Sequence, residues 1–204
     1  MSALILAGGA SSRFGKSKAL VEVAGRPLLA HVAGGMRSLA DETIVSVSDE
    51  ESAQQLRQIL PQAMFVQDER RNRGPIEGFL QGFRKARGEI VLVAPCDAPL
   101  IRPDTYRILL GVLRDHDAAV PRLDVFDPVR AVYRRSAVLN VLAETEVNSP
   151  SALVDRLRAT FVGPDQLRAV DPKLDSFLDV NTRGDLEEVR RRIKSERSIR
   201  LRRI

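Results

Sequence analysis

The chain has 204 residues, of which 44% are hydrophobic, with 32 Lys and Arg against 27 Asp and Glu and a formal net charge of +5. This length and composition fit one globular domain with a single core, and they exclude a fibrous or disordered chain. The longest apolar runs are far shorter than the roughly 20 residues of a membrane helix, and the amino terminus lacks the pattern of a secretory leader. We therefore expect a cytoplasmic protein with no membrane partner.

The excess positive charge lies at the carboxyl end. Residues 190–204 hold eight Lys and Arg and one Glu, which leaves 24 basic and 26 acidic residues in the rest of the chain. The main part is thus nearly neutral, and with no Trp and 4% aromatic residues it offers few platforms for stacking bases. We expect no nucleic-acid partner, a domain over residues 1–193, and a basic tail over 194–204 that catalysis does not need.

Short apolar runs alternate with amphipathic stretches from the first residue onward, which is typical of a single α/β domain with a mostly parallel, mixed sheet. The expected strands are residues 3–6, 43–47, 63–67, 89–94, 118–121 and 129–133, and the expected helices are residues 27–39, 50–60, 75–86, 103–115, 136–143, 149–158 and 183–192. Pro27, Pro75 and Pro103 stand where a first helical turn tolerates proline.

A glycine-rich loop, residues 6–18, follows the first expected strand with the sequence LAGGASSRFGKSK. In doubly wound sheets, ligands bind outside the carboxyl ends of the strands, so this loop should lie over the site. Gly8 and Gly9 let backbone N–H groups approach phosphate oxygens, while Arg13 and Lys18 supply positive charge. The loop predicts a binding site for a triphosphate.

Two other phosphate-binding loops fit less well. A Walker A loop needs four residues between its glycines, whereas five separate Gly9 from Gly15, and residues 19–23 alternate like a short strand rather than starting a helix. The dinucleotide pattern G-x-G-x-x-G is absent from the loop.

Asp97 follows a run of aliphatic residues, 90–94, and so should lie at the same edge of the sheet as the loop. Magnesium prefers one or two carboxylates together with substrate phosphates, which makes Asp97 a candidate ligand; the alternative is a turn or helix-cap residue before Pro99. Cys96 is the single cysteine, and both histidines lie in or next to expected helices far from it in the sequence, so we expect a buried small residue rather than a nucleophile.

Four motifs, in order, resemble those of the nucleotidyltransferase family that includes molybdenum cofactor guanylyltransferase (MobA). They are the pattern LAGGxxxRxGxxK in residues 6–18, Asp68 followed by GPIEG at 74–78, PCDAP at 95–99 and DVNT at 179–182. The chain departs from the family at Ser17, where an acid is usual, and at Asp179, where Asn is more usual.

The resemblance implies a three-layer, Rossmann-like nucleotidyltransferase fold and Mg²⁺-dependent transfer of GMP from GTP to molybdopterin, with release of pyrophosphate. It implies catalytic roles for Arg13, Lys18 and Asp97, with the metal on Asp97 and the acceptor near Asn181. The implied nucleotide-binding residues are Leu6, Ala7, Gly8, Gly9, Arg13, Lys18, Ser46, Asp68 and Gly78. We expect a monomer, with molybdoenzymes or cofactor-delivery proteins as further partners.

Two alternatives stay open. The same chemistry can serve another base or acceptor, as in cytidylyl transfer to molybdopterin or nucleotidyl transfer to a phosphosugar, cobinamide phosphate or phospholactate. A nucleotide-binding module without turnover could also retain the loop, and an assay of pyrophosphate release separates the two.

Overall fold

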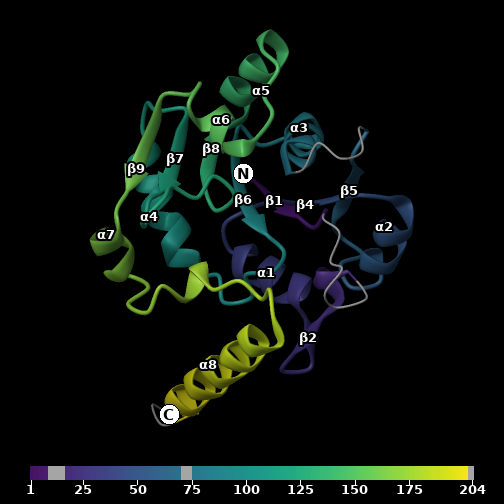
Figure 1. The fold of residues 1–204 in the computed structure, drawn as a ribbon, viewed down its shortest axis with the longest axis vertical. Helices are drawn as coiled ribbons and strands as arrows, with labels where there is room; N and C mark the ends of the chain where they lie inside the picture. Colours follow the sequence, from purple (N-terminus) through teal and green to yellow (C-terminus); the bar gives the residue numbers. More distant parts are fainter. Residues whose placement is uncertain (9–16, 70–74, 202–204) are drawn as a thin grey trace.

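A seven-stranded sheet forms the centre of the protein, in the order β5-β4-β1-β6-β8-β7-β9 (Figure 1). The structure is a computed structural model that describes residues 1–8, 17–69 and 75–201. The strands are β1 (Ser2–Leu6), β4 (Glu42–Val47), β5 (Met64–Gln67), β6 (Ile90–Pro95), β7 (Ala118–Pro121), β8 (Val132–Arg134) and β9 (Ala159–Val162). β8 runs antiparallel to both of its neighbours, and the other pairs are parallel. The mixed, mostly parallel sheet confirms the expected fold class.

Helices cover both faces of the sheet, which gives the three layers (Figure 1). One face carries α1 (Leu28–Met36), α2 (Glu50–Arg57), α4 (Pro103–Leu113) and α7 (Pro164–Arg168), and the other carries α3 (Pro75–Lys85), α5 (Arg135–Glu144) and α6 (Pro150–Val154). Because successive strand residues point to opposite faces, Ala3 and Ile5 join the first core cluster while Leu4 joins the second. All three side chains are fully buried.

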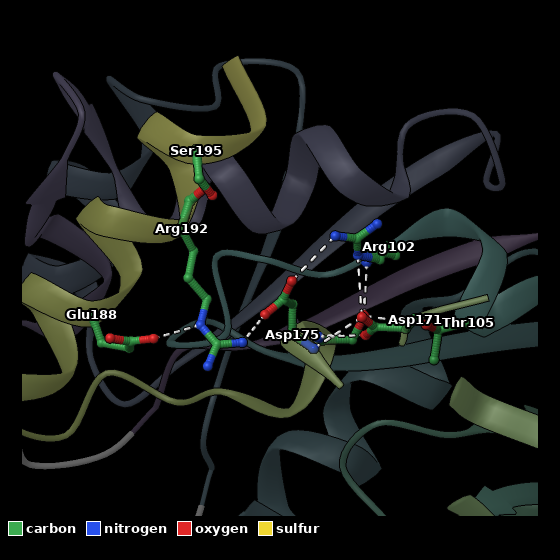
Figure 2. A network of polar contacts seen from close by, with 8 residues as sticks. Arg102, Thr105, Asp171, Asp175, Glu188, Arg192 and Ser195 are labelled. Carbon is green, nitrogen blue, oxygen red and sulfur yellow. Dashed lines mark hydrogen bonds and ion pairs between the residues drawn. The ribbon is translucent and has the colours of Figure 1, made fainter. Parts of the chain in front are cut away.

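The last helix, α8 (Arg183–Leu201), extends away from the body of the molecule (Figure 1). Its first turns pack Val189 with Val180 and the hairpin of β2 (Glu22–Val23) and β3 (Arg26–Pro27). Figure 2 shows that Arg192 also reaches Asp175, whose carboxylate lies beside Arg102. The first ten residues of α8 are therefore fastened to the domain.

Several expected boundaries are wrong. The expected strand at 129–133 begins later, at Val132, because Val129 donates its backbone N–H to Asp127 at 3.1 Å within a turn. The expected helix at 149–158 ends at Val154, and the chain then enters β9, which pairs with β7 and was not predicted. β3 and α7 were not predicted either, whereas β2 lies within residues 19–23, which alternate like a short strand.

Helix ends also differ from expectation. Pro27 pairs with Glu22 in the small hairpin, so α1 begins at Leu28 and not at the proline. α8 continues to Leu201 instead of ending at residue 192, with ion pairs between neighbouring turns, such as Arg190 with Glu187. In the described part of the chain, no helix is both long enough and apolar enough to cross a membrane.

Candidate active site

The carboxyl ends of β1, β4 and β6 meet at one edge of the sheet. Leu6 pairs with Ser46 on one side and with Pro95 on the other. Just beyond the strands, Ala7 donates its N–H to Ser46 O at 2.8 Å, and Cys96 donates its N–H to Leu6 O at 3.0 Å. The segments that carry Gly8 and Asp97 therefore leave the sheet side by side, as the sequence predicts.

The glycine-rich loop is described only at its two ends. Leu6, Ala7 and Gly8 are placed at the end of β1, and Lys18 opens a single 3-10 turn that leads to β2. In the described residues from 17 onward, the chain enters this 3-10 turn and then β2 rather than an α-helix, which agrees with rejecting a Walker A loop. The expected site residues Gly9 and Arg13 lie outside the described residues.

Lys18 joins two oxygens that are far apart in the sequence. Its ammonium group lies 2.9 Å from Asp97 Oδ2 and 2.6 Å from Asn181 Oδ1. The side chains of Lys18 and Asp97 remain 24% and 17% exposed, so the group is accessible from solvent while partly shielded by protein. Three residues from the first, third and fourth sequence motifs thus converge at one point.

The segment that carries Asn181 is fixed by its own hydrogen bonds. Val180 donates its N–H to Asp97 O at 2.9 Å. Asp185 Oδ2 accepts the N–H groups of Asn181 and Thr182 at 2.9 and 2.7 Å, and these bonds, led by the one from Asn181, lower the pKa of Asp185. Sequence reasoning missed Asp185, although Thr182-x-x-Asp185 before a helix is the signature of a capping box.

Ser46, Asp68 and Gly78 gather around the ends of β1 and β4. A Cβ added at Gly78 would lie 2.5 Å from Ser46 Oγ and 3.3 Å from Leu6 Cδ2. A Cβ at Gly82, one turn later, would meet Leu4 Cδ1 at 2.4 Å. The two glycines let α3 pack directly on β1 and β4 and bring the second motif to the same edge.

Asp68 lies beside the start of the glycine-rich loop, with Oδ2 3.4 Å from the position of a Cβ at Gly8. Burial, and then the nearby charge of Glu77, raise the pKa of Asp68 to about 6, while the Ser46 hydroxyl opposes the shift. Glu77 is only 2% exposed and accepts a hydrogen bond from Gln81 at 3.0 Å. Sequence reasoning missed Glu77, because an acid on an amphipathic helix carries no local sign of burial.

The site offers hard oxygen donors that suit magnesium, namely the Asp97 carboxylate and the Asn181 amide oxygen, both now in contact with the Lys18 ammonium. Among the described residues, no three His, Cys, Asp or Glu side chains are grouped as a metal site. Magnesium would therefore need substrate phosphates to complete its coordination, which is its usual mode of binding.

Two neighbouring features do not belong to this chemistry. Cys96 is buried, as expected for a small core residue, and burial raises the pKa of its thiol to about 12, which favours the neutral thiol. A cavity of about 430 Å³ lies between α3 and residues 142–147 and is lined by Glu77, but not by Lys18, Asp97 or Asn181. The cavity is therefore separate from the point where Lys18, Asp97 and Asn181 converge.

A three-layer α/β fold with a glycine-rich loop after β1, and a carboxylate, an amine and an amide converging at the same edge, defines a nucleotide-binding protein of the doubly wound class. Comparison with known proteins gives the family. Residues 3–160 match the family model described as the MobA-like NTP transferase domain, and the chain belongs to this family.

Relatives agree over nearly the whole chain. The chain is 32% identical over 200 residues to a protein of Methanosarcina acetivorans named "probable molybdenum cofactor guanylyltransferase", covering 92% of this chain and 89% of the relative. It is 29% identical over 199 residues to the molybdenum cofactor guanylyltransferase of Desulfosudis oleivorans, covering 95% and 96% of the two chains.

Solved structures extend the likeness to the fold. The molybdopterin-guanine dinucleotide biosynthesis protein A of Archaeoglobus fulgidus superposes with a TM-score of 0.79 at 26% identity, covering 96% of this chain and 100% of that one. The 4-diphosphocytidyl-2C-methyl-D-erythritol synthase of Anaerococcus prevotii has a TM-score of 0.71 at 15% identity, covering 95% of each chain, and shares the fold alone.

Proposed function

We propose that the chain is a nucleotidyltransferase that moves GMP from GTP to molybdopterin and releases pyrophosphate. The observation that carries the proposal is the convergence of Lys18 Nζ on Asp97 and Asn181, at 2.9 and 2.6 Å, where the glycine-rich loop leaves β1. An in-line displacement at phosphorus needs positioning and neutralised charge rather than a protein nucleophile, and this group of residues supplies both. The names of the relatives supply the base and the acceptor.

The nucleotide would lie along the ends of β1 and β4. In this proposal the backbone of Leu6, Ala7, Gly8 and Gly9 holds it, with Ser46, Asp68 and Gly78 beside its base and ribose. The close packing of Gly78 on Ser46 and Leu6 supports this placement, because it brings the backbone of the second motif against the ends of β1 and β4. Arg13 would bind the outer phosphates.

Lys18 and Asp97 would have different roles at the α-phosphorus. Asp97 would hold Mg²⁺, which supplies neutralisation of phosphate charge when bound. Lys18 would leave Asp97 and donate to the oxygens on which negative charge develops. Asn181, held by Val180 and Asp185, would face the acceptor, whose own phosphate is the nucleophile. The protein would act as a cytoplasmic monomer, with molybdoenzymes or delivery proteins as later partners.

Nucleotide choice provides the first test. Calorimetric titration with GTP, CTP, ATP and UTP in Mg²⁺ should show GTP binding most tightly, since a site paired with the guanine edge leaves buried polar groups without partners when another base binds. Equal or tighter binding of CTP would move the protein to cytidylyl transfer. If GTP binds selectively but no pyrophosphate is released in the presence of molybdopterin, the protein is either a nucleotide-binding module without turnover or a transferase that uses another acceptor.

A further inference from the structure

Arg130 is a buried cation that contacts the segment leading to Asn181, the residue proposed to face the acceptor. Its side chain is 7% exposed, and it precedes β8 at the edge of the sheet where β6 ends. Its guanidinium donates to the carboxylates of Asp127 and Asp179, and its Nε donates to Ser176 O at 3.0 Å. A buried guanidinium is tolerated only when its donors are satisfied, and here three separate acceptors receive them.

Two of these acceptors lie on the segment that leads to the site. Ser176 is fixed from the opposite side, because its N–H donates to Asp171 at 2.8 Å and its Oγ accepts from Arg102 N at 3.0 Å. Asp171 and Arg102, which provide this second anchor, belong to the network of Figure 2. The chain then runs through Asp179 and Val180, whose N–H binds Asp97 O. Arg130 is thus the last side-chain anchor before the residues that contact Asp97 and Lys18.

Because Asp179 is an acid, its ion pair with Arg130 affects how the site would bind an anionic substrate. Asp179 is 35% exposed and lies two residues before Asn181, so an unpaired carboxylate there would add negative charge near a site meant for phosphates. Like charges disfavour binding strongly when they are partly shielded from water. Arg130 neutralises this carboxylate and holds it through an ion pair.

We propose that Arg130 is a positioning residue, which uses its pair with Asp179 to set the 176–181 segment so that Asn181, and not a carboxylate, is presented to the anionic acceptor. The kinetic part of this inference rests on the proposed function, whereas the structural part does not. Asp179→Asn retains an oxygen that can accept a hydrogen bond from Arg130, so replacing Asp179 should disturb the segment less than replacing Arg130.

The test compares Arg130→Met, Asp179→Asn and the double variant. Arg130→Met should lower kcat/KM at least about tenfold, mainly through KM for the acceptor, because the bared carboxylate opposes its binding. Asp179→Asn should stay within about threefold of the wild type. The double variant should recover most of the loss, a rescue that simple loss of packing would not give. Equal losses in the single Arg130 variant and the double variant would overturn the inference.

Hydrogen exchange of residues 176–182 provides a readout that needs no acceptor. In Arg130→Met the Val180 N–H should exchange faster with solvent, because the segment that holds this N–H against Asp97 O has lost its contacts with Arg130. Arg134→Met is the matched control, because Arg134 lies at the other end of β8 and donates to His116 O at 2.9 Å. No faster exchange in Arg130→Met than in this control would contradict the positioning role.

Two outcomes separate this inference from the proposed function. A wild-type protein with no transfer to molybdopterin would defeat the function, and the exchange experiment would then decide the positioning role alone. If Arg130→Met does not fold, Arg130→Lys retains the charge but loses the fork of donors, and it should show the same changes at smaller amplitude. Exchange and acceptor KM at wild-type values in Arg130→Lys would then overturn the inference.

Discussion

Asp97 is the carboxylate on which the proposed metal chemistry depends. Asp97→Asn keeps the shape and the contact with Lys18 while removing the charge that Mg²⁺ requires, so turnover should fall by at least about 100-fold with the fold intact. The measurement is steady-state turnover against Mg²⁺ concentration, with thermal unfolding as the check on folding. Asp104→Asn, a change on the exposed surface of α4, is the control. An unchanged Mg²⁺ dependence in Asp97→Asn would remove this residue from the metal site.

Lys18 contacts oxygens in this structure that would otherwise face the metal and the acceptor. Lys18→Ala should therefore reduce the rate of the chemical step by roughly 2 to 4 kcal/mol of transition-state stabilisation, while GTP affinity changes little. Arg13→Ala should show the opposite pattern, because its proposed partners are charged before and during the reaction. Single-turnover kinetics and calorimetry measure the two effects, and the reverse pattern would exchange the roles.

Asp68 should make nucleotide binding depend on pH. Its pKa is raised to about 6, chiefly by burial, so the carboxylate becomes protonated as the pH falls through that value. If the ionised form accepts a hydrogen bond from the ribose or base, guanosine affinity should be constant above about pH 7 and fall below pH 6. Guanosine avoids titration of the GTP phosphates. In Asp68→Asn this dependence should disappear, and a decrease that persists in the variant would assign it to another group.

The same shift has a consequence for folding. A carboxyl group whose pKa is higher in the folded state than in the unfolded state opposes folding once it ionises, so its cost is absent below about pH 4 and complete above about pH 6. Asp68→Asn should thus gain stability over the wild type as pH rises through this window. Urea unfolding at pH 4 and pH 7 measures the difference in the free energy of unfolding between the variant and the wild type. This difference should be small, because Asp68 is partly exposed to solvent.

At the level of elements, α8 divides into an anchored part and an extension. Arg192 pairs with Asp175, which is 5% exposed, and Ile193 packs against the cluster around Val180. Removing residues 194–204 spares both contacts, so turnover should stay within about tenfold of the wild type. The truncated protein should also keep its melting temperature within a few degrees. A larger loss of turnover with the fold intact would give the tail a role in catalysis.

Across the whole molecule, the sequence predicts best what is encoded locally. β1, β4 and β6 are short aliphatic runs, and the rule that ligands lie beyond the carboxyl ends of parallel strands is enough to bring Lys18 and Asp97 to one edge. β9 escaped prediction because it has only four residues, and its pairing with β7 is what identifies it as a strand. The extent of α8 was missed because its charged turns resemble a fraying tail.

The residues that support the site were harder to predict, because their roles depend on contacts between distant parts of the chain. Arg130 and Asp179 are 49 positions apart, and Asp68 owes its raised pKa to burial and to the charge of Glu77 on α3. Such pairings depend on the folded chain and leave no spacing to detect. Asp185 is the exception, since its capping-box pattern was available in the sequence.

Transfer of labelled GMP tests the central claim most directly. The protein would be incubated with Mg²⁺, molybdopterin and GTP labelled at the α-phosphate, and the products separated, with Asp97→Asn as the inactive control. The label should appear on molybdopterin with one pyrophosphate released per transfer, and labelled CTP should transfer far more slowly. Label that stays on GTP, or that passes to molybdopterin more readily from CTP, would contradict guanylyl transfer by this chain.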